Sequence, residues 1–280
     1  MSLAIGVISG KGGVGKTTLV SNLGVTISKY FNKKAIVVDA NFSSSHLGIH
    51  LNLYRNLSNT IKEVLSGESS LQQSIYIHPI SGLRVLPSSL KLGKFNTQKF
   101  GKILRDLKKT YDIVIVDLAP GLGKEVINVA KHLDAAIIVT TPDLPSATDA
   151  LKTVKLLEKL KVDLLGVILN RVSGNVYELT RYEIESMLKY PCSIAIPEDK
   201  SAIESLALGL PLVLYKPSSK ASLAIKKLAA ALIGTNYEPK DFGYRIKKLI
   251  GMIKEEPVIL IKPKEKKVKN KLNKNEFDIK

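Results

Sequence analysis

Five short runs of apolar, largely β-branched residues recur along the chain and are separated by more polar sequence. They cover residues 3–8, 35–38, 113–116, 135–139 and 164–169. Because these runs are apolar throughout rather than alternating, they are typical of strands buried on both faces of a parallel sheet. Residues 17–31 and 147–160 repeat apolar positions at helical spacing. The alternation of strand and helix predicts the α/β class, with a three-layer, doubly wound, mostly parallel sheet.

A glycine-rich segment joins the first predicted strand to the first predicted helix. Residues 10–17 read Gly-Lys-Gly-Gly-Val-Gly-Lys-Thr and fit the pattern G-x-x-x-x-G-K-[ST]. In this context the backbone N–H groups and the helix N-terminus are suited to cradle phosphates, while Lys16 reaches the β and γ phosphates. The nucleotide-binding residues expected here are Gly12, Gly13, Val14, Gly15, Lys16, Thr17 and Thr18. The segment predicts a P-loop NTPase that binds a nucleoside triphosphate.

Two aspartates stand at the ends of apolar strands, where a carboxylate without a partner would be costly. Asp117 follows the run 113–116, and Asp39 follows the run 35–38. We expect Mg²⁺ to be held by Thr17 and Asp117, with Asp39 sharing the metal site.

Lys11 is a second lysine inside the glycine-rich segment, and one chain does not need it to hold phosphates. Residues 11–18 resemble the deviant Walker A motif of the MinD and ParA ATPases, in which the early lysine reaches the nucleotide of a partner subunit. Further segments resemble the archaeal MinD branch in order and spacing, and the resemblance extends to about residue 235. These segments are 37–41, 113–121, 140–143, 169–172 and 196–199.

This resemblance implies an ATPase that hydrolyses ATP to ADP and phosphate and forms a homodimer in the ATP state. Lys11 and Lys16 would serve catalysis, together with Asp39 and the position of Asn41. A protein partner that stimulates turnover is also implied, without being identified. The biological role would be the spatial positioning of a division, motility or segregation complex.

The resemblance also assigns the nucleoside contacts. Asn170 would hydrogen-bond the adenine edge with Arg171 beside it, and Pro197 and Glu198 would line the other side of the base.

The chain departs from the family at Asn41, where a second carboxylate usually helps to position or activate the attacking water. An amide can orient a water molecule by hydrogen bonding, but it cannot accept a proton. We therefore expect intact ATP binding with slow or partner-stimulated hydrolysis.

The charge of the chain favours an anionic partner. Lys and Arg number 42 against 25 Asp and Glu, which gives a net charge of +17. Hydrophobic residues make up 45% of the chain, which excludes wholesale disorder. We expect an ATPase domain over residues 1–235 and a basic extension over residues 236–280, with a disordered lysine-rich end.

Residues 241–254 form a candidate amphipathic helix in this extension. Its apolar stripe comprises Phe242, Ile246, Leu249, Ile250 and Ile253. Three interpretations remain open for the stripe: an anionic membrane surface, packing against the domain, and the groove of a partner. Residues 258–261 are apolar and would fit a short strand.

Alternative functions follow from the same features. The charge also favours a ParA-like partition protein that binds DNA non-specifically, and Asn41 favours a nucleotide-bound scaffold with little turnover. No signal peptide or membrane-spanning run is evident, so we expect a cytoplasmic protein that the stripe would hold at the inner face of the cell membrane.

The cysteine and histidine residues do not indicate an additional metal site. Cys192 is the one cysteine, so the paired cysteines of iron–sulfur carriers are missing. His46 and His50 lie four residues apart without a third ligand nearby, and we interpret them as surface or packing residues.

Overall fold

The computed structural model describes residues 2–54, 57–89, 99–239 and 257–263. Its centre is an eight-stranded sheet in the order β3-β4-β2-β5-β1-β6-β7-β8. Neighbouring strands are parallel except β3 and β4. The strands are β1 (Leu3–Ile8), β2 (Ala35–Ala40), β3 (Tyr76–Ile77), β4 (Arg84–Leu86), β5 (Ile113–Leu118), β6 (Ala135–Thr140), β7 (Asp163–Val172) and β8 (Cys192–Pro197).

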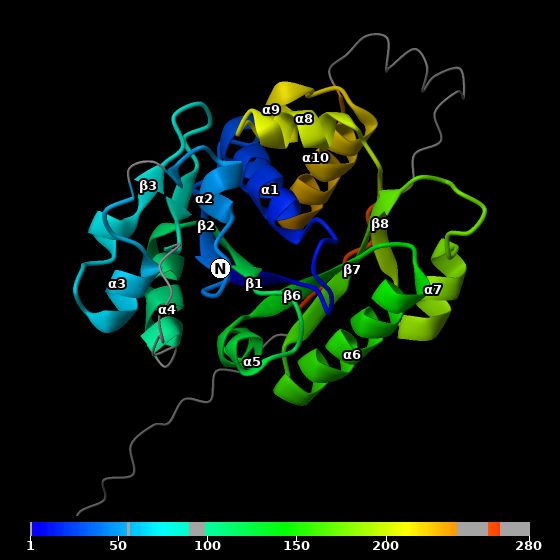
Figure 1. The fold of residues 1–280 in the computed structure, drawn as a ribbon, viewed down its shortest axis with the longest axis horizontal. Helices are drawn as coiled ribbons and strands as arrows, with labels where there is room; N and C mark the ends of the chain where they lie inside the picture. Colours follow the sequence, from blue (N-terminus) through cyan, green and yellow to red (C-terminus); the bar gives the residue numbers. More distant parts are fainter. Residues whose placement is uncertain (1, 55–56, 90–98, 240–256, 264–280) are drawn as a thin grey trace, which may run out of the picture.

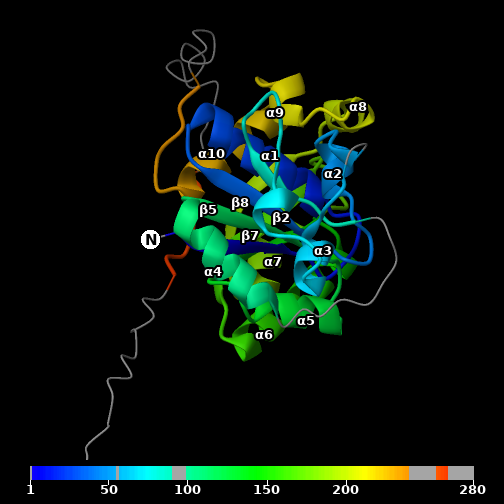
Figure 2. The ribbon, with the colours of Figure 1, turned by 90° about the vertical axis from the view of Figure 1, so that its left-hand side faces the viewer.

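Helices cover both faces of this sheet, as Figures 1 and 2 show. One face carries α1 (Lys16–Tyr30), α2 (Leu47–His50), α8 (Ser201–Ala207), α9 (Leu212–Tyr215) and α10 (Lys220–Leu232). The other carries α3 (Ile61–Ser66), α4 (Phe100–Thr110), α5 (Lys124–Ala130), α6 (Leu144–Leu160) and α7 (Arg181–Leu188). The 3₁₀ turn η2 (Gln72–Ser74) precedes β3.

The central strands bury side chains on both faces, which explains their unbroken apolar sequence. In β2, Ile36 and Val38 belong to the core beneath α4 to α7, whereas Val37 belongs to the core beneath α1 and α10. The same alternation runs through β5 and β1. The three-layer, mostly parallel class predicted from the sequence is therefore confirmed.

Strands at the margins of the sheet were not predicted. β3, with 2 residues, and β4, with 3, are too short to show a period, and β8 is an edge strand with partly buried positions. In the interior, the predicted runs agree with β1, β2, β5, β6 and β7 to within a few residues at their ends. No helix in the described ranges has both the length and the apolar character of a membrane span.

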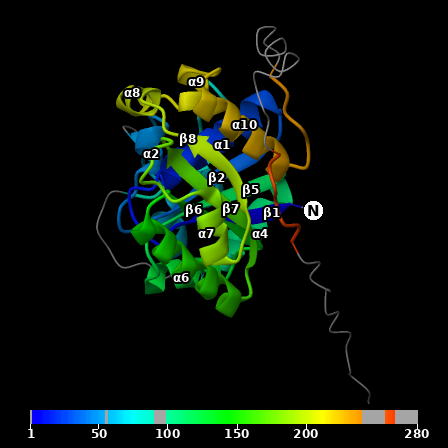
Figure 3. The same ribbon diagram turned by 90° about the vertical axis from the view of Figure 1, so that its right-hand side faces the viewer.

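The described part of the C-terminal extension packs against the domain. Tyr237 meets Phe31 edge to face, with ring centroids 6.1 Å apart. Farther along, the backbone N–H groups of Ile259 and Ile261 donate to the carbonyl oxygens of Ser193 and Leu165, at 3.1 and 2.8 Å. Figure 3 shows this segment, residues 257–263, in orange-red beside the sheet.

Residues 258–261 are thus hydrogen-bonded to β7 and β8 without forming a regular strand of the sheet. The candidate helix 241–254 and the lysine-rich end beyond residue 263 lie outside the described residues.

Candidate functional site

The glycine-rich segment lies between the end of β1 and the start of α1, at the carboxyl edge of the sheet. Gly13 and Gly15 have φ angles of 80° and 89°, in the left-handed region that favours glycine. At Gly15 a Cβ atom would also lie only 2.3 Å from Nδ2 of Asn170. Both the turn and the close approach therefore require glycine at position 15.

Lys16 and Asp117 form a buried ion pair at the base of this loop. Nζ of Lys16 donates to Oδ1 of Asp117 at 2.9 Å, and the two side chains are 6% and 1% exposed. Asp39 stands beside Asp117 in the register of β2 and β5, and it is fully buried. Burial, together with the charge of Asp117, raises the pKa of Asp39. Of these two buried carboxyl groups, Asp117 is paired with the ammonium group of Lys16, whereas Asp39 is hydrogen-bonded by neutral donors.

This donor set fits a magnesium ion that is completed by a nucleotide. No group of three or more Asp, Glu, His or Cys side chains capable of holding a metal occurs among the described residues. Mg²⁺ usually takes one or two protein ligands and completes its shell with phosphate oxygens and water. The Thr17 hydroxyl and the Asp117 carboxylate suit that arrangement, and the excess of carboxyl groups over ammonium groups favours a cation.

Asp39 uses its oxygens to organise the loop that follows β2. It accepts hydrogen bonds from the backbone N–H of Asn41 at 3.0 Å, from Oγ of Ser45 at 2.7 Å and from the N–H of Leu47 at 3.4 Å. Within the same loop, Oδ1 of Asn41 accepts from the N–H of Ser44 at 3.2 Å. The side-chain oxygen of Asn41 is therefore engaged in the turn.

Glu125, near the start of α5, ties this loop to the segment that follows β5. Its carboxylate accepts from the N–H of Phe42 at 2.6 Å and from Oγ of Ser43 at 2.5 Å. The loops after β2 and β5 are consequently linked to each other as well as to the strands before them.

A hollow of about 400 Å³ opens at Lys16 and is lined by four segments of the chain. Its lining comprises residues 9 and 11–18, together with Asn41, Ser44, His46, His50, Pro120 and Leu206. His46 and His50 belong to this lining, a role that their spacing in the sequence did not reveal. The sequence did contain one indication of it, because both histidines follow shortly after a strand whose carboxyl end lies at the same edge of the sheet as the P-loop. We call this space the phosphate hollow.

A second hollow of about 880 Å³ adjoins Gly15 and Thr18 and gathers the four residues predicted to contact the base. Nδ2 of Asn170 donates to the carbonyl oxygen of Val14 at 2.8 Å, which connects β7 to the P-loop. Arg171 pairs with Glu198 at 2.9 Å, and Pro197 precedes that glutamate at the end of β8.

Lys11 lies at the outer rim of the loop. Its ammonium group is 3.8 Å from Oδ1 of Asp143, and both side chains are about half exposed. Asp143 also caps α6 by accepting from the N–H of Ser146 at 2.9 Å. A long, exposed ion pair of this kind contributes little stability, so Lys11 can exchange its partner at small cost.

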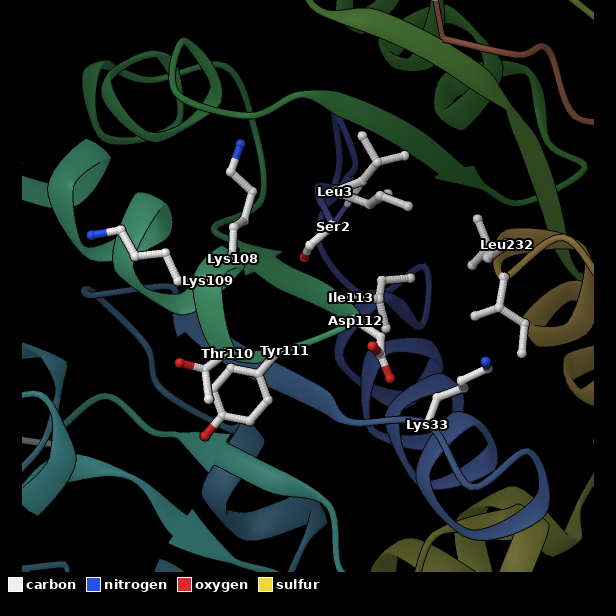
Figure 4. A pocket seen from close by; sticks show the side chains of 12 residues that line it. Ser2, Leu3, Lys33, Lys108, Lys109, Thr110, Tyr111, Asp112, Ile113 and Leu232 are labelled. Atoms are coloured by element: carbon white, nitrogen blue, oxygen red, sulfur yellow. The ribbon is translucent and has the colours of Figure 1, made fainter.

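Another hollow, of about 490 Å³, lies at the opposite edge of the sheet, by the starts of β1 and β5. Lys108 and Lys109 border it, but their ammonium groups pair with Asp134 and Asp106 at 2.8 and 2.7 Å. Figure 4 shows both side chains turned away from Lys33. The phosphate hollow is therefore the stronger candidate for an anionic ligand.

Thiol chemistry has no support in the described structure. Cys192 is buried, and burial raises the pKa of its thiol to about 11. A protonated, inaccessible thiol is a poor nucleophile and a poor metal ligand.

Comparison with known proteins agrees with this geometry. A sequence model of the ParA family, described as NUBPL iron-transfer P-loop NTPase, matches residues 1–233. An uncharacterized ATP-binding protein of Methanocaldococcus jannaschii is 38% identical over 241 residues, which are 85% of this chain and 90% of that protein.

Two solved structures share the fold. The cell division ATPase MinD of Pyrococcus furiosus is 30% identical with a TM-score of 0.78, and the match covers 83% of this chain and 98% of that one. MinD of Pyrococcus horikoshii, complexed with Mg-ADP, is 29% identical with a TM-score of 0.78, and the match covers 90% and 98%.

The buried pair Lys16–Asp117 can be tested in the nucleotide-free protein with EDTA present. Lys16→Met leaves Asp117 buried without its partner, so we expect the free energy of unfolding in urea to fall by about 3 kcal/mol. The double variant Lys16→Met/Asp117→Asn should recover most of that loss. As a control, Lys152→Met breaks the more exposed pair with Asp149 and should cost under about 1 kcal/mol. Additive losses in the double variant would contradict a direct coupling.

Proposed function

The chain belongs to the ParA/MinD family of P-loop NTPases, and from this premise we propose that it is an ATP-dependent dimerising switch. Binding of Mg-ATP would join two copies, and hydrolysis to ADP and phosphate would separate them. The observation that carries the proposal is the placement of Lys11, which lies at the exposed rim of the P-loop with a weakly held partner. The output would be the positioning of a division, motility or segregation complex.

Nucleotide binding follows from the two adjoining hollows. The triphosphate would occupy the phosphate hollow, with backbone N–H groups of residues 12–18 and the ammonium group of Lys16 around it. Lys16 would then exchange Asp117 for phosphate oxygens, which frees that carboxylate for a cation. Mg²⁺ held by Thr17 and Asp117, with Asp39 nearby, would neutralise charge on the phosphates.

The base would enter the larger hollow beside Asn170 and Arg171. Pro197 and Glu198, at and just after the end of β8, line the same hollow, with Glu198 paired to Arg171. Its volume of about 880 Å³ accommodates a purine and its ribose.

A second copy of the chain is the proposed occupant of the P-loop face. Several apolar side chains are exposed, of which Ile203 and Leu206 line the two hollows, and exposed apolar side chains of this kind are typical of a protein interface. They are Leu144, Val176, Tyr177, Ile203, Leu206 and Leu208. In a twofold dimer each Lys11 would leave Asp143 and reach the phosphates of the opposite subunit.

The basic extension would hold the dimer on an anionic surface. Residues 235–239 and 257–263 flank the candidate helix 241–254 and both contact the domain. Two weak anchors in one dimer would bind an extended surface with higher avidity than one. We propose an anionic membrane as that surface, and the net charge of +17 keeps non-specific DNA as the alternative.

The dimer proposal predicts a nucleotide-dependent change of mass. By size-exclusion chromatography with light scattering, we expect a monomer with ADP and a dimer with a non-hydrolysable ATP analogue. Lys11→Ala should remain monomeric with the analogue while its affinity for nucleotide changes by no more than about threefold. Lys152→Ala, at an exposed position on α6, is the matched control and should dimerise. A Lys11→Ala dimer of wild-type strength would contradict the proposal.

Asn41 should limit turnover. Asn41→Asp restores a carboxylate at the position where the family usually has one, and we expect phosphate release to rise at least about tenfold because general-base catalysis contributes that much or more. The measurement is steady-state phosphate release at saturating Mg-ATP, with Asn41→Ala as the control. If Asn41→Asp gives no acceleration and Asn41→Ala has no effect, Asn41 does not limit the reaction.

Point variants within residues 241–254 test which anionic surface the extension binds, and they leave residues 257–263 unchanged. In the full chain with a non-hydrolysable ATP analogue, we expect sedimentation with vesicles containing about 30% anionic lipid. The variant Ile246→Glu/Ile250→Glu places charges on the apolar stripe and should abolish sedimentation with the vesicles, because a charged helix face does not enter the membrane interface. Undiminished vesicle binding by that variant, or binding to duplex DNA alone, would exclude the membrane.

A further inference from the structure

The phosphate hollow contains few groups that can accept a proton. Its lining includes no carboxylate, although every lining residue lies in the described part of the chain. Lys11 and Lys16 carry only donors when charged, and the hydroxyls of serine and threonine are very weak bases. The remaining candidates are the imidazole rings of His46 and His50.

Asn41 does not supply the missing acceptor. Its Oδ1 already accepts the N–H of Ser44 at 3.2 Å, and its remaining lone pair can orient a water molecule by hydrogen bonding. A water molecule that attacks phosphorus must lose a proton, and an amide oxygen is too weak a base to take it.

His50 differs from His46 in its surroundings. His50 is the last residue of α2 and is partly buried, whereas His46 precedes the helix, is exposed and has Ser44 within 3.4 Å of its ring. The charged groups that act on His50 are Asp117 on β5, Lys16 on α1 and His46. His50 therefore lies close to the charges that surround the phosphates.

The ring of His50 is neutral at physiological pH. Burial is the main cause that lowers its pKa to about 4, while the charge of Asp117 opposes the shift. A neutral imidazole keeps a lone pair that can accept a hydrogen bond.

We propose that His50 is the general base for the water that attacks the γ-phosphate, and that it performs the task for which Asn41 lacks a basic oxygen. This inference rests on the proposed ATPase function. A lone pair of the water oxygen forms the new bond to the γ-phosphorus. The bond to the β,γ-bridging oxygen breaks and leaves its electrons with ADP. The proton of the water passes to an imidazole nitrogen of His50 and then to solvent.

Three variants separate this role from a structural one. His50→Leu removes the acceptor, His50→Gln keeps an acceptor that cannot take a proton, and His46→Gln makes the same change at the exposed histidine of the same hollow. Single-turnover phosphate release with saturating Mg-ATP reports the chemical step, and binding of a fluorescent ATP analogue reports affinity. Thermal unfolding checks that each variant is folded.

We expect phosphate release to fall about 100-fold in His50→Leu and by at least about tenfold in His50→Gln, the range typical of losing a general base. Affinity for the analogue should change by no more than about threefold, and the loss of rate in His46→Gln should be clearly smaller than the loss in His50→Gln. Adding Asn41→Asp to His50→Leu should restore most of the rate, because a carboxylate then takes the proton. Simple misfolding would not be corrected by that change.

A readout without turnover is the ring resonance of His50. It is assigned by its absence in His50→Gln, and it should shift more on binding ADP with aluminium fluoride than on binding ADP alone. Equal shifts with the two ligands would count against contact at the reacting phosphate.

The outcomes distinguish this inference from the proposed function. If the wild type hydrolyses ATP and His50→Leu does so equally fast, or if His46→Gln causes the larger loss, the assignment of His50 is wrong and the ATPase stands. If the wild type binds ATP but releases no phosphate, both the ATPase proposal and this assignment fail.

Discussion

The structure depends on two carboxyl groups, Asp39 and Asp117, which are buried side by side at the ends of neighbouring strands. Asp117 is paired with Lys16 at 2.9 Å, and Asp39 is held by donors from the loop that follows its own strand. Neither aspartate can be left charged and alone at this depth, because the loss of hydration is large. The ends of β2 and β5, the start of α1 and the loop 41–47 are thus organised around the same charges.

This arrangement connects ligand binding to loop position. In the proposed nucleotide complex, Lys16 would leave Asp117 for the phosphates, Asp117 would require another cation, and Asp39 beside it would respond to the changed charge. Asp39 also accepts hydrogen bonds from Ser45 and the N–H of Leu47, so the loop that carries Asn41 and precedes His50 would respond to the exchange. Glu125 extends the connection to α5. The phosphate hollow is consequently bordered by segments that share hydrogen bonds rather than by independent loops.

Two features were predictable from the sequence because few residue types suit them. Gly15 has a φ of 89°, and a Cβ atom there would lie 2.3 Å from Nδ2 of Asn170, so this position favours glycine. Runs that are apolar throughout indicated strands buried on both faces of a parallel sheet. The prediction that His46 and His50 are surface or packing residues agrees with an exposed His46 and a partly buried His50, but the sequence did not place them at the hollow. Lys16 and Asp117, whose charges act on His50, are distant from it in sequence, and no local pattern indicates that proximity. The short strands β3 and β4 were missed because two or three residues carry no measurable period.

The amino-acid sequence by itself determined the class of fold, the P-loop and the family, because glycine geometry, strand burial and motif spacing are local properties. The tertiary structure alone decided which side chains share the hollow above Lys16 and which partners they already hold. Lys11 is paired with Asp143, the oxygen of Asn41 accepts from Ser44, and His50 lines the hollow at Lys16. Each of these contacts joins segments that follow different strands at one edge of the sheet. The packing of the whole domain brings those segments together.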